Sequence, residues 1–111
     1  MAHNRDDLLK GTLDLLILKT LDLEAMHGWG IAERIQLFSD DVLRVPTGSL
    51  YPALQRLQRK GLIVAEWRQT ENNRRARYYR LASKGRKRLA ADQEIWTRTS
   101  VAVNRVLEAS L

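Results

Sequence analysis

The stretch Thr47-Gly48-Ser49-Leu50-Tyr51-Pro52-Ala53-Leu54-Gln55-Arg56-Leu57 decides the fold. Its apolar residues recur at i, i+3, i+4 and i+7, which places them on one face of a helix: Leu50, Ala53, Leu54 and Leu57. Polar side chains lie largely on the other faces, among them Thr47, Ser49, Tyr51 and Gln55. A short helix with one apolar stripe, small polar residues at its start and basic residues at its end suits the major groove of DNA. We therefore interpret the stretch as a recognition helix.

The start of this helix is predicted from its capping residues. Thr47 or Ser49 can act as the N-cap, because a short side-chain oxygen accepts hydrogen bonds from the first backbone N–H groups. Pro52 lacks an amide hydrogen and is expected only in a first helical turn, which favours Ser49 as the cap or an irregular first turn. In either case the free N–H groups at this end suit a phosphate. Lys60 and Gly61 are expected to end the helix.

A first helix is predicted from about Leu8 to Leu23. One apolar face consists of Leu9, Leu13, Leu16, Ile17 and Leu21. Leu8, Leu15 and Leu18 lie off that face, so the helix is apolar nearly all round and must be covered on more than one side. It is either a central core helix or a helix whose second face, with Leu8 and Leu15, meets another subunit. We favour the second interpretation, because a chain of 111 residues has little material for two thick layers.

A second helix is predicted over about Trp29 to Phe38, with these residues on one face: Ile31, Ile35 and Phe38. His27, just before it, could bind a metal, but no second ligand lies at a useful spacing. We therefore expect a loop or capping histidine. Residues 42–45 are expected to form a short, extended linker, because Pro46 biases the residue before it away from helical angles.

A β-hairpin is predicted from two β-prone segments, residues 62–68 and 77–81, joined by a polar connection. In the second strand Tyr79 and Leu81 should face inward, while Tyr78 and Arg80 face outward. Three arginines gather at the tip of the hairpin: Arg74, Arg75 and Arg77. A basic tip can be merely solvated, but beside a recognition helix we expect it to contact phosphates or the minor groove.

A last helix is predicted from Ser83, its expected N-cap, toward Ala109. An apolar stripe runs along it and includes Leu89, Ile95, Trp96, Val103 and Val106. A helix of about seven turns that projects from a small domain has little in its own chain to pack on. We expect it to pair with a second copy, together with the first helix; the alternative is a helix folded back on its own domain.

The composition limits the class of protein. The net charge of +6 favours a polyanionic partner, either nucleic acid or an anionic membrane surface. With no cysteine, two histidines, no glycine-rich phosphate loop and no carboxylate pair beside a candidate base, neither an enzyme nor a cofactor or metal site is expected. A polar start and the lack of a long apolar run predict a cytoplasmic protein. A basic membrane-surface protein and a winged-helix module that never touches DNA remain the alternatives.

The order helix, helix, helix, hairpin, long helix is that of a winged helix-turn-helix. Over nearly its full length the sequence resembles the PadR family of bacterial transcriptional regulators. The resemblance rests on segments that are weak singly and specific in this order: Gly11–Leu18 (GTLDLLIL), His27–Ile31 (HGWGI), Gly48–Leu54 (GSLYPAL) with Leu57, Gly61–Ile63 (GLI), Arg74–Leu81 (RRARYYRL) and Gly85–Arg86.

The resemblance implies a mostly α fold with a small β-hairpin, in which residues 1–82 form the DNA-binding domain and residues 83–111 a dimerisation helix. It implies a homodimeric repressor that recognises double-stranded DNA at an inverted repeat. Contacts to DNA would fall on Thr47, Ser49, Tyr51, Gln55, Arg74, Arg75 and Arg77. The dimer contacts expected above would fall on Leu8, Leu15, Leu89, Ile95, Trp96, Val103 and Val106.

The sequence departs from the family pattern at two places. Trp29 stands where many members carry tyrosine, and we interpret it as a packing substitution. The chain ends after one C-terminal helix, as in the small subfamily, which argues against the phenolic acid effectors of larger members. Small members can bind flat aromatic compounds between subunits, beside a tryptophan of the last helix. Trp96 occupies a matching place. It either stacks on an aromatic ligand or is simply a large side chain of the dimer core.

Overall fold

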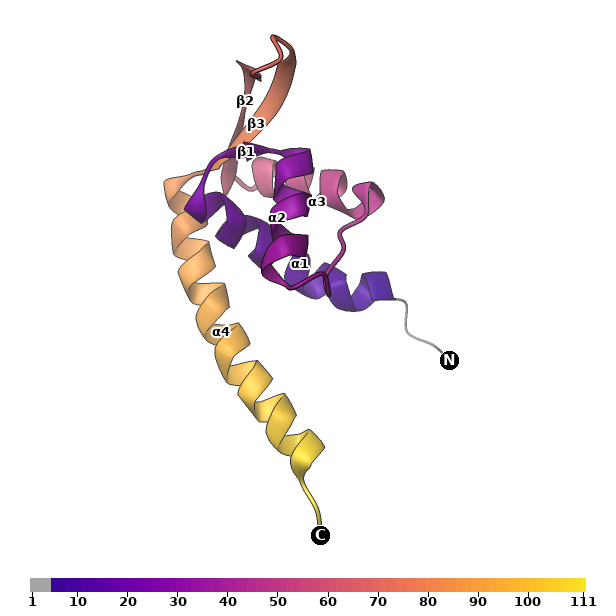
Figure 1. Ribbon diagram of the computed structural model, residues 1–111. Helices are drawn as coiled ribbons and strands as arrows, with labels where there is room; N and C mark the ends of the chain where they lie inside the picture. Colours follow the sequence, from indigo (N-terminus) through magenta and orange to yellow (C-terminus); the bar gives the residue numbers. More distant parts are fainter. Residues whose placement is uncertain (1–4) are drawn as a thin grey trace.

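The computed structural model describes the backbone of residues 5–111 and the side chains from Thr12 onward, so the expected contact of Leu8 lies outside the described side chains. The elements are α1 (Arg5–Leu23), β1 (Met26–His27), α2 (Gly28–Phe38), α3 (Thr47–Arg59), β2 (Ile63–Gln69), β3 (Arg75–Leu81) and α4 (Ser83–Glu108). Figure 1 shows the first three helices gathered into a compact body, with a β-ribbon at one end and α4 leaving it at the other side. This confirms the predicted mostly α fold with a hairpin and a long last helix.

The core forms where α1, α2 and α3 meet the base of the β-ribbon. The predicted apolar face of α3 is confirmed, because Leu50, Ala53, Leu54 and Leu57 are all buried. Other buried residues of the core are Leu13, Ile17, Leu18, Ile31, Ile35 and Ile63. On α2, Ile31 and Ile35 of the predicted face are buried, whereas Phe38 at the end of the same face is 58% exposed. An ion pair of 2.9 Å between Arg56 and Asp14 also ties α3 to α1.

The hairpin extends farther than predicted, and a third strand joins it. The sheet order is β1-β3-β2, with both pairs antiparallel. The two-residue β1 was not predicted, because its pairing of Met26 with Tyr79 joins residues far apart in the sequence. Tyr79 and Leu81 are buried, which confirms their inward direction. Asn73 closes the loop in the left-handed region at φ 61°, a conformation that asparagine adopts readily.

Both helices expected to begin at a capping side chain begin differently. The N-cap of α3 is Pro46, whose carbonyl accepts hydrogen bonds from the N–H groups of Ser49 and Leu50, at 3.0 Å each. The N-cap of α4 is Ala82, so the predicted caps Thr47, Ser49 and Ser83 were wrong.

Pro52 is the second departure in α3. It is the sixth helical residue, beyond the first turn, so the prediction that it marks a first turn was also wrong. Proline there removes the N–H donor for the Gly48 carbonyl. Gly48 is exposed, so water can take the place of that donor.

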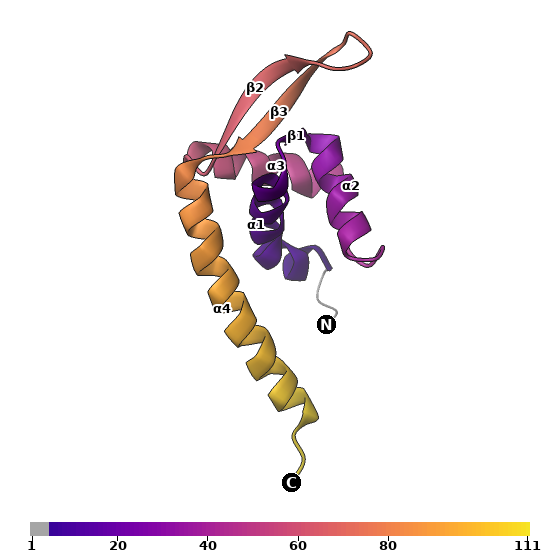
Figure 2. The same cartoon turned by 60° about the vertical axis from the view of Figure 1, so that its left-hand side comes forward.

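The helix α4 begins in the core and ends far from it. Gly85 and Leu89 are buried near its start, against the base of the ribbon and α1. Figures 1 and 2 show the rest of α4 running away from the body, and the Cα trace measures 62 × 29 × 24 Å. None of the helices in the described part of the chain combines the length and apolar character needed to cross a membrane.

Candidate nucleic-acid interface

The helix α3 presents a row of polar side chains on the side away from its buried stripe. Thr47, Tyr51 and Gln55, spaced by four residues, are exposed and share one face. Ser49 is only partly exposed and lies on another side of the helix. Because the opposite face is anchored in the core and by the Arg56–Asp14 pair, the row has a fixed orientation relative to the body.

Tyr51 both packs on α2 and remains exposed. Its ring lies against the first residue of α2, since a Cβ built on Gly28 would be 3.0 Å from Cε1 of Tyr51 and 3.1 Å from its hydroxyl oxygen. The side chain is nevertheless 45% exposed. One edge of the ring therefore packs on α2 while the rest of the side chain remains available for a base or phosphate.

The wing, defined as β2, β3 and the loop between them, carries the three predicted arginines. Arg74, Arg75 and Arg77 are all exposed. Trp67 lies opposite Arg77 in the strand register, and the guanidinium carbons of Arg75 and Arg77 are 5.2 and 5.7 Å from the centroid of its ring. Sequence reasoning missed Trp67, although its place in an alternating strand with two arginines opposite was a usable signal.

A cavity of about 340 Å³, which we call the notch, lies between the wing and the start of α2. Its lining includes Tyr51, Trp29, Arg74, Arg75 and Arg77. The N-terminus of α2 also borders the notch, and its backbone N–H groups and helix dipole add to the positive charge of the arginines. The notch thus combines the features that favour a bound phosphate.

Trp29 joins the notch to the amino end of α3. It also borders a second cavity of about 310 Å³, which Thr47 and Tyr51 line as well. The structure therefore brings Tyr51 together with the three wing arginines in the notch and places Thr47 beside Tyr51 in the second cavity, whereas Ser49 and Gln55 line neither cavity. Trp29 is 66% exposed, so the interpretation of this residue as a packing substitution was wrong.

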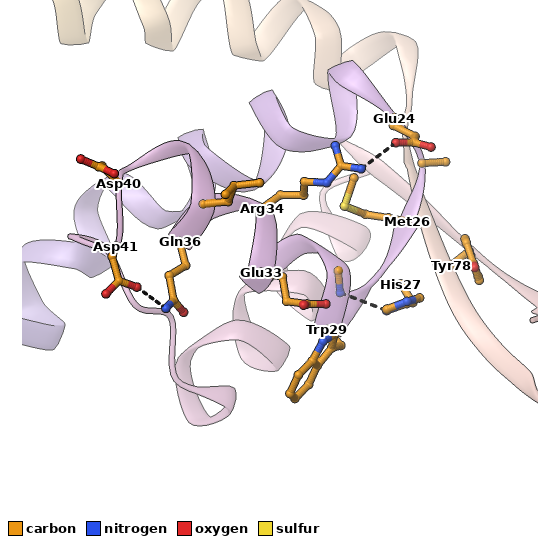
Figure 3. Close-up of a pocket in the computed structure, with 13 residues that line it drawn as sticks. Glu24, Met26, His27, Trp29, Glu33, Arg34, Gln36, Asp40, Asp41 and Tyr78 are labelled. Carbon is orange, nitrogen blue, oxygen red and sulfur yellow. Dashed lines mark hydrogen bonds and ion pairs between the residues drawn. The ribbon is translucent and has the colours of Figure 1, made fainter.

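The other side of α2 has the opposite charge. Figure 3 shows a groove of about 800 Å³ whose lining includes four carboxylates: Glu24, Glu33, Asp40 and Asp41. A hydrogen bond from Gln36, followed by the contact with Arg44, lowers the pKa of Asp41. This groove would repel a phosphate backbone. Although Arg34 pairs with Glu24 and Arg44 with Asp41, carboxylates outnumber cations in this groove, so the notch is the more favourable side of α2 for a phosphate.

His27 lies between these two surfaces. Its Nδ1 accepts a hydrogen bond from the Gly30 N–H at 3.0 Å, which confirms the interpretation of a capping histidine. The described residues contain no cluster of three or more His, Cys, Asp or Glu side chains that could hold a metal.

At the base of the wing, burial raises the pKa of the Tyr79 hydroxyl, and the charge of Arg77 opposes that rise. Tyr79 is thus neutral at physiological pH and leaves the charge of Arg77 intact.

The residues expected at a dimer contact fall into two groups. Leu89 is 5% exposed and belongs to the core of the single chain. Farther along α4, four residues that we call the α4 stripe are at least 48% exposed: Ile95, Trp96, Val103 and Val106. Leu15 of α1 joins Ile95 and Trp96 in the lining of a cavity of about 390 Å³ between the two helices.

Comparison with known proteins identifies the family. The sequence model described as "Transcriptional regulator PadR-like family" matches residues 17–91. A PadR-like transcriptional regulator from Bacillus cereus is 27% identical, covers 94% of this chain and 99% of its own, and superposes with a TM-score of 0.81. A transcriptional regulator from Clostridium thermocellum is 28% identical over 89% of this chain and 96% of its own, also with a TM-score of 0.81.

A further relative is an uncharacterized protein of Lysinibacillus sphaericus. It is 25% identical over 104 residues, which cover 94% of this chain and 95% of that protein. The family match covers more than half of the chain and agrees with the winged helix-turn-helix order of its elements. The chain belongs to the PadR-like family of transcriptional regulators.

Proposed function

We propose that this regulator binds an inverted repeat in duplex DNA as a homodimer and represses transcription there. The observation that carries the proposal is the notch, in which Tyr51 of α3 meets the three wing arginines, with Thr47 beside Tyr51 in the neighbouring cavity. Base-reading side chains and phosphate-binding side chains must lie next to each other in a protein that reads DNA sequence.

The two parts of this surface have different tasks in the proposal. The row on α3, with Thr47, Tyr51 and Gln55, enters the major groove, where polar side chains can distinguish base pairs. Ser49, near the start of the same helix, contacts the edge of the groove or a phosphate. The wing arginines bind the backbone or the adjacent minor groove and fix the position of α3. The net charge of +6 supports a polyanionic partner.

A dimer supplies the second copy of α3 that an inverted repeat requires. We propose that residues 1–82 form the DNA-binding domain and residues 83–111 the dimerisation helix. The support is the α4 stripe, an apolar surface of four exposed residues that continues the face of α4 packed on α1. An exposed apolar surface of this kind is typical of a protein–protein contact. Two half-sites about one helical turn apart would match such a dimer.

We propose a second role for Trp96: its indole ring stacks on a planar aromatic effector, and binding of this effector releases the DNA. The cavity of about 390 Å³ and the half-exposed indole support this use. The alternative is that a partner subunit covers Trp96 completely. Titrating the protein with planar dyes separates the two, because stacking on Trp96 quenches its fluorescence and a Trp96→Leu variant loses that quenching.

The wing arginines provide the central test. Exchanging Arg74 and Arg75 for alanine should weaken binding to all duplexes and reduce the slope of log affinity against log salt by about one unit per lost phosphate contact. The matched control exchanges Arg68 and Arg80, two exposed arginines that alternate onto the opposite face of the wing, and changes the net charge equally.

Three results would contradict the proposal. Equal effects of the two double variants would mean that only net charge matters. An unchanged affinity of the Arg74/Arg75 variant would indicate a winged-helix module that does not touch DNA. Tighter binding to anionic vesicles than to duplex DNA would indicate a membrane-surface protein. Footprinting beside the protein's own gene then tests for the protected inverted repeat.

A further inference from the structure

We infer that Trp67 is a positioning residue of the wing, which holds Arg75 and Arg77 in the orientation that binds the DNA backbone. The inference rests on the proposed DNA binding and adds a residue that makes the wing effective. Its basis is that one indole ring contacts two guanidinium groups, with distances of 5.2 and 5.7 Å from the guanidinium carbons to the ring centroid. Arginine at such distances from a tryptophan ring is held by cation–π attraction.

The strand register explains how one ring reaches both arginines. Trp67 pairs directly with Arg77, and the next pair on the same face is Gln69 with Arg75. Trp67 is therefore the direct neighbour of one arginine and the diagonal neighbour of the other, and both positions lie within reach of a large aromatic side chain.

The face of the wing that carries Trp67 is the face on the side of the body. Its inner pairs, Ala65 with Tyr79 and Ile63 with Leu81, lead into the core, where Ile63, Tyr79 and Leu81 are buried. Farther out, Arg75 and Arg77 line the notch beside Tyr51. Figure 2 shows the ribbon extending beyond the body, and the outer residues of this face are exposed: Trp67, Gln69, Arg75 and Arg77. The two ordered arginines thus lie on the proposed DNA side.

The opposite face of the same wing offers a comparison. Arg68 lies 5.2 Å from the ring of Tyr78, but its guanidinium also forms an ion pair with Glu66. Within the described residues, neither Arg75 nor Arg77 forms an ion pair with a carboxylate. Stacking occupies the flat face of a guanidinium and leaves the N–H groups at its edge free for a phosphate. Of the two aromatic rings of the wing that contact arginines, only Trp67 therefore holds guanidinium groups that no carboxylate neutralises.

Trp67 has no other evident role in the single chain. It is 56% exposed and does not belong to the buried core. An arginine side chain that is already ordered loses less conformational freedom on binding than a free one, which strengthens the complex. The indole therefore acts through Arg75 and Arg77 and need not touch DNA itself.

The test uses the full-length protein and a random-sequence duplex at low salt, so that no operator is required. Trp67→Ala should weaken binding about tenfold, because two arginine side chains must then be ordered on binding, and Trp67→Phe should restore most of the loss. The control Tyr78→Ala removes an aromatic ring from the opposite face, where the ring contacts His27 and the ion-paired Arg68, and should change affinity less than about twofold. In an Arg75→Ala/Arg77→Ala background, Trp67→Ala should have no further effect.

Nuclear magnetic resonance of the free protein gives a readout that does not depend on DNA. The side-chain protons of Arg75 and Arg77 should show upfield ring-current shifts that disappear in Trp67→Ala and persist in Tyr78→Ala. The absence of these shifts in the wild type would overturn the inference. The inference would also be overturned if Trp67→Ala bound the duplex as tightly as the wild type. It would likewise be overturned if Trp67→Ala weakened binding just as much in the Arg75→Ala/Arg77→Ala background. If the wild type binds no duplex, the proposed function fails, and the shifts alone decide whether Trp67 orders the arginines.

Discussion

Tyr51 of α3 lies directly against Gly28, the first residue of α2, with 3.2 Å from its Cζ to the position of a Cβ on Gly28. A side chain at position 28 would meet the ring, so glycine is what allows Tyr51 to take this position. The contact joins the first helix of the helix-turn-helix to an exposed residue of the second. It therefore controls where the tyrosine hydroxyl points relative to the notch.

Gly28→Ala should affect DNA binding more than stability. The exposed ring can move by a few tenths of an ångström, and alanine favours the helix, so the unfolding free energy should change by less than about 1 kcal/mol. Duplex affinity should fall about three- to tenfold, because the shift of the ring carries the Tyr51 hydroxyl away from the position in which it meets a base or phosphate. The unfolding free energy is measured by urea denaturation, and the duplex affinity by fluorescence anisotropy. In a Tyr51→Ala background the substitution should have no effect on affinity, and a persisting loss would show that Tyr51 is not involved.

Gly85→Ala should destabilise the junction between the wing and α4. A Cβ at this position would be 2.0 Å from the carbonyl oxygen of Leu62, a backbone atom that also accepts a hydrogen bond from the Ala82 N–H. Overpacking against backbone should lower the unfolding free energy by at least about 2 kcal/mol in urea denaturation.

Gly48→Ala is the matched control for Gly85→Ala. It is also a helical glycine, but a Cβ there meets nothing within 4 Å in the described structure. It should leave stability unchanged or raise it by up to about 1 kcal/mol. Equal effects of the two substitutions would contradict the role assigned to the Gly85 contact.

Tyr79 should make stability depend on pH at the alkaline end. Burial raises the pKa of its hydroxyl, so the folded state holds this proton more tightly than the unfolded state does. The stabilisation is complete below the unfolded pKa of about 10 and is lost as the pH rises through the folded pKa. Tyr79→Phe cannot ionise. Above about pH 10, and until the folded pKa is reached, the unfolding free energy of the variant should therefore rise relative to that of the wild type by up to about 1.4 kcal/mol per pH unit. The unfolding free energies of the two proteins are measured by urea denaturation at each pH. If they change in parallel with pH, Tyr79 has the same pKa in the folded and unfolded states, which contradicts the prediction.

Periodicity in the sequence predicted the parts of the fold that depend on local pattern. The buried face of α3 and the inward direction of Tyr79 and Leu81 follow from helical and strand spacing alone. β1 could not be predicted in the same way, because two residues carry no periodicity and the strand exists only through pairing with β3. Pro52 misled the prediction of the helix start, since an exposed glycine four residues earlier tolerates the lost hydrogen bond.

The charged residues of the candidate interface and Tyr51 were predicted, but its two tryptophans were not. Arg74, Arg75 and Arg77 stand out in the sequence as a basic run beside a turn. The exposure of Trp29 depends on how α2 packs against α3 and the wing, whereas the contact of Trp67 with the arginines follows from the strand register of the hairpin. An aromatic residue in a short helix or strand is expected in the core unless the register is known.

Val103→Asp should separate the subunits without unfolding them. Val103 belongs to the α4 stripe and is 50% exposed in the single chain. A charge at this position therefore disturbs the proposed contact with a second subunit and leaves the core of the single chain intact. The variant should sediment as a monomer, keep its unfolding free energy per chain at low concentration, and bind an inverted repeat no more tightly than a single half-site. Val101→Asp is the matched control, because Val101 is 47% exposed and lies about 160° round the helix from Val103.

Leu89→Ala completes the test of α4 and separates folding from assembly. Leu89 is 5% exposed in the single chain, and its truncation should lower the unfolding free energy by about 2–5 kcal/mol, as for other buried leucines. At concentrations where it is still folded, this variant should remain a dimer in sedimentation, because its side chain packs within its own subunit. A dimeric Val103→Asp, or a monomeric Val101→Asp, would show that the α4 stripe is not the surface that pairs two copies.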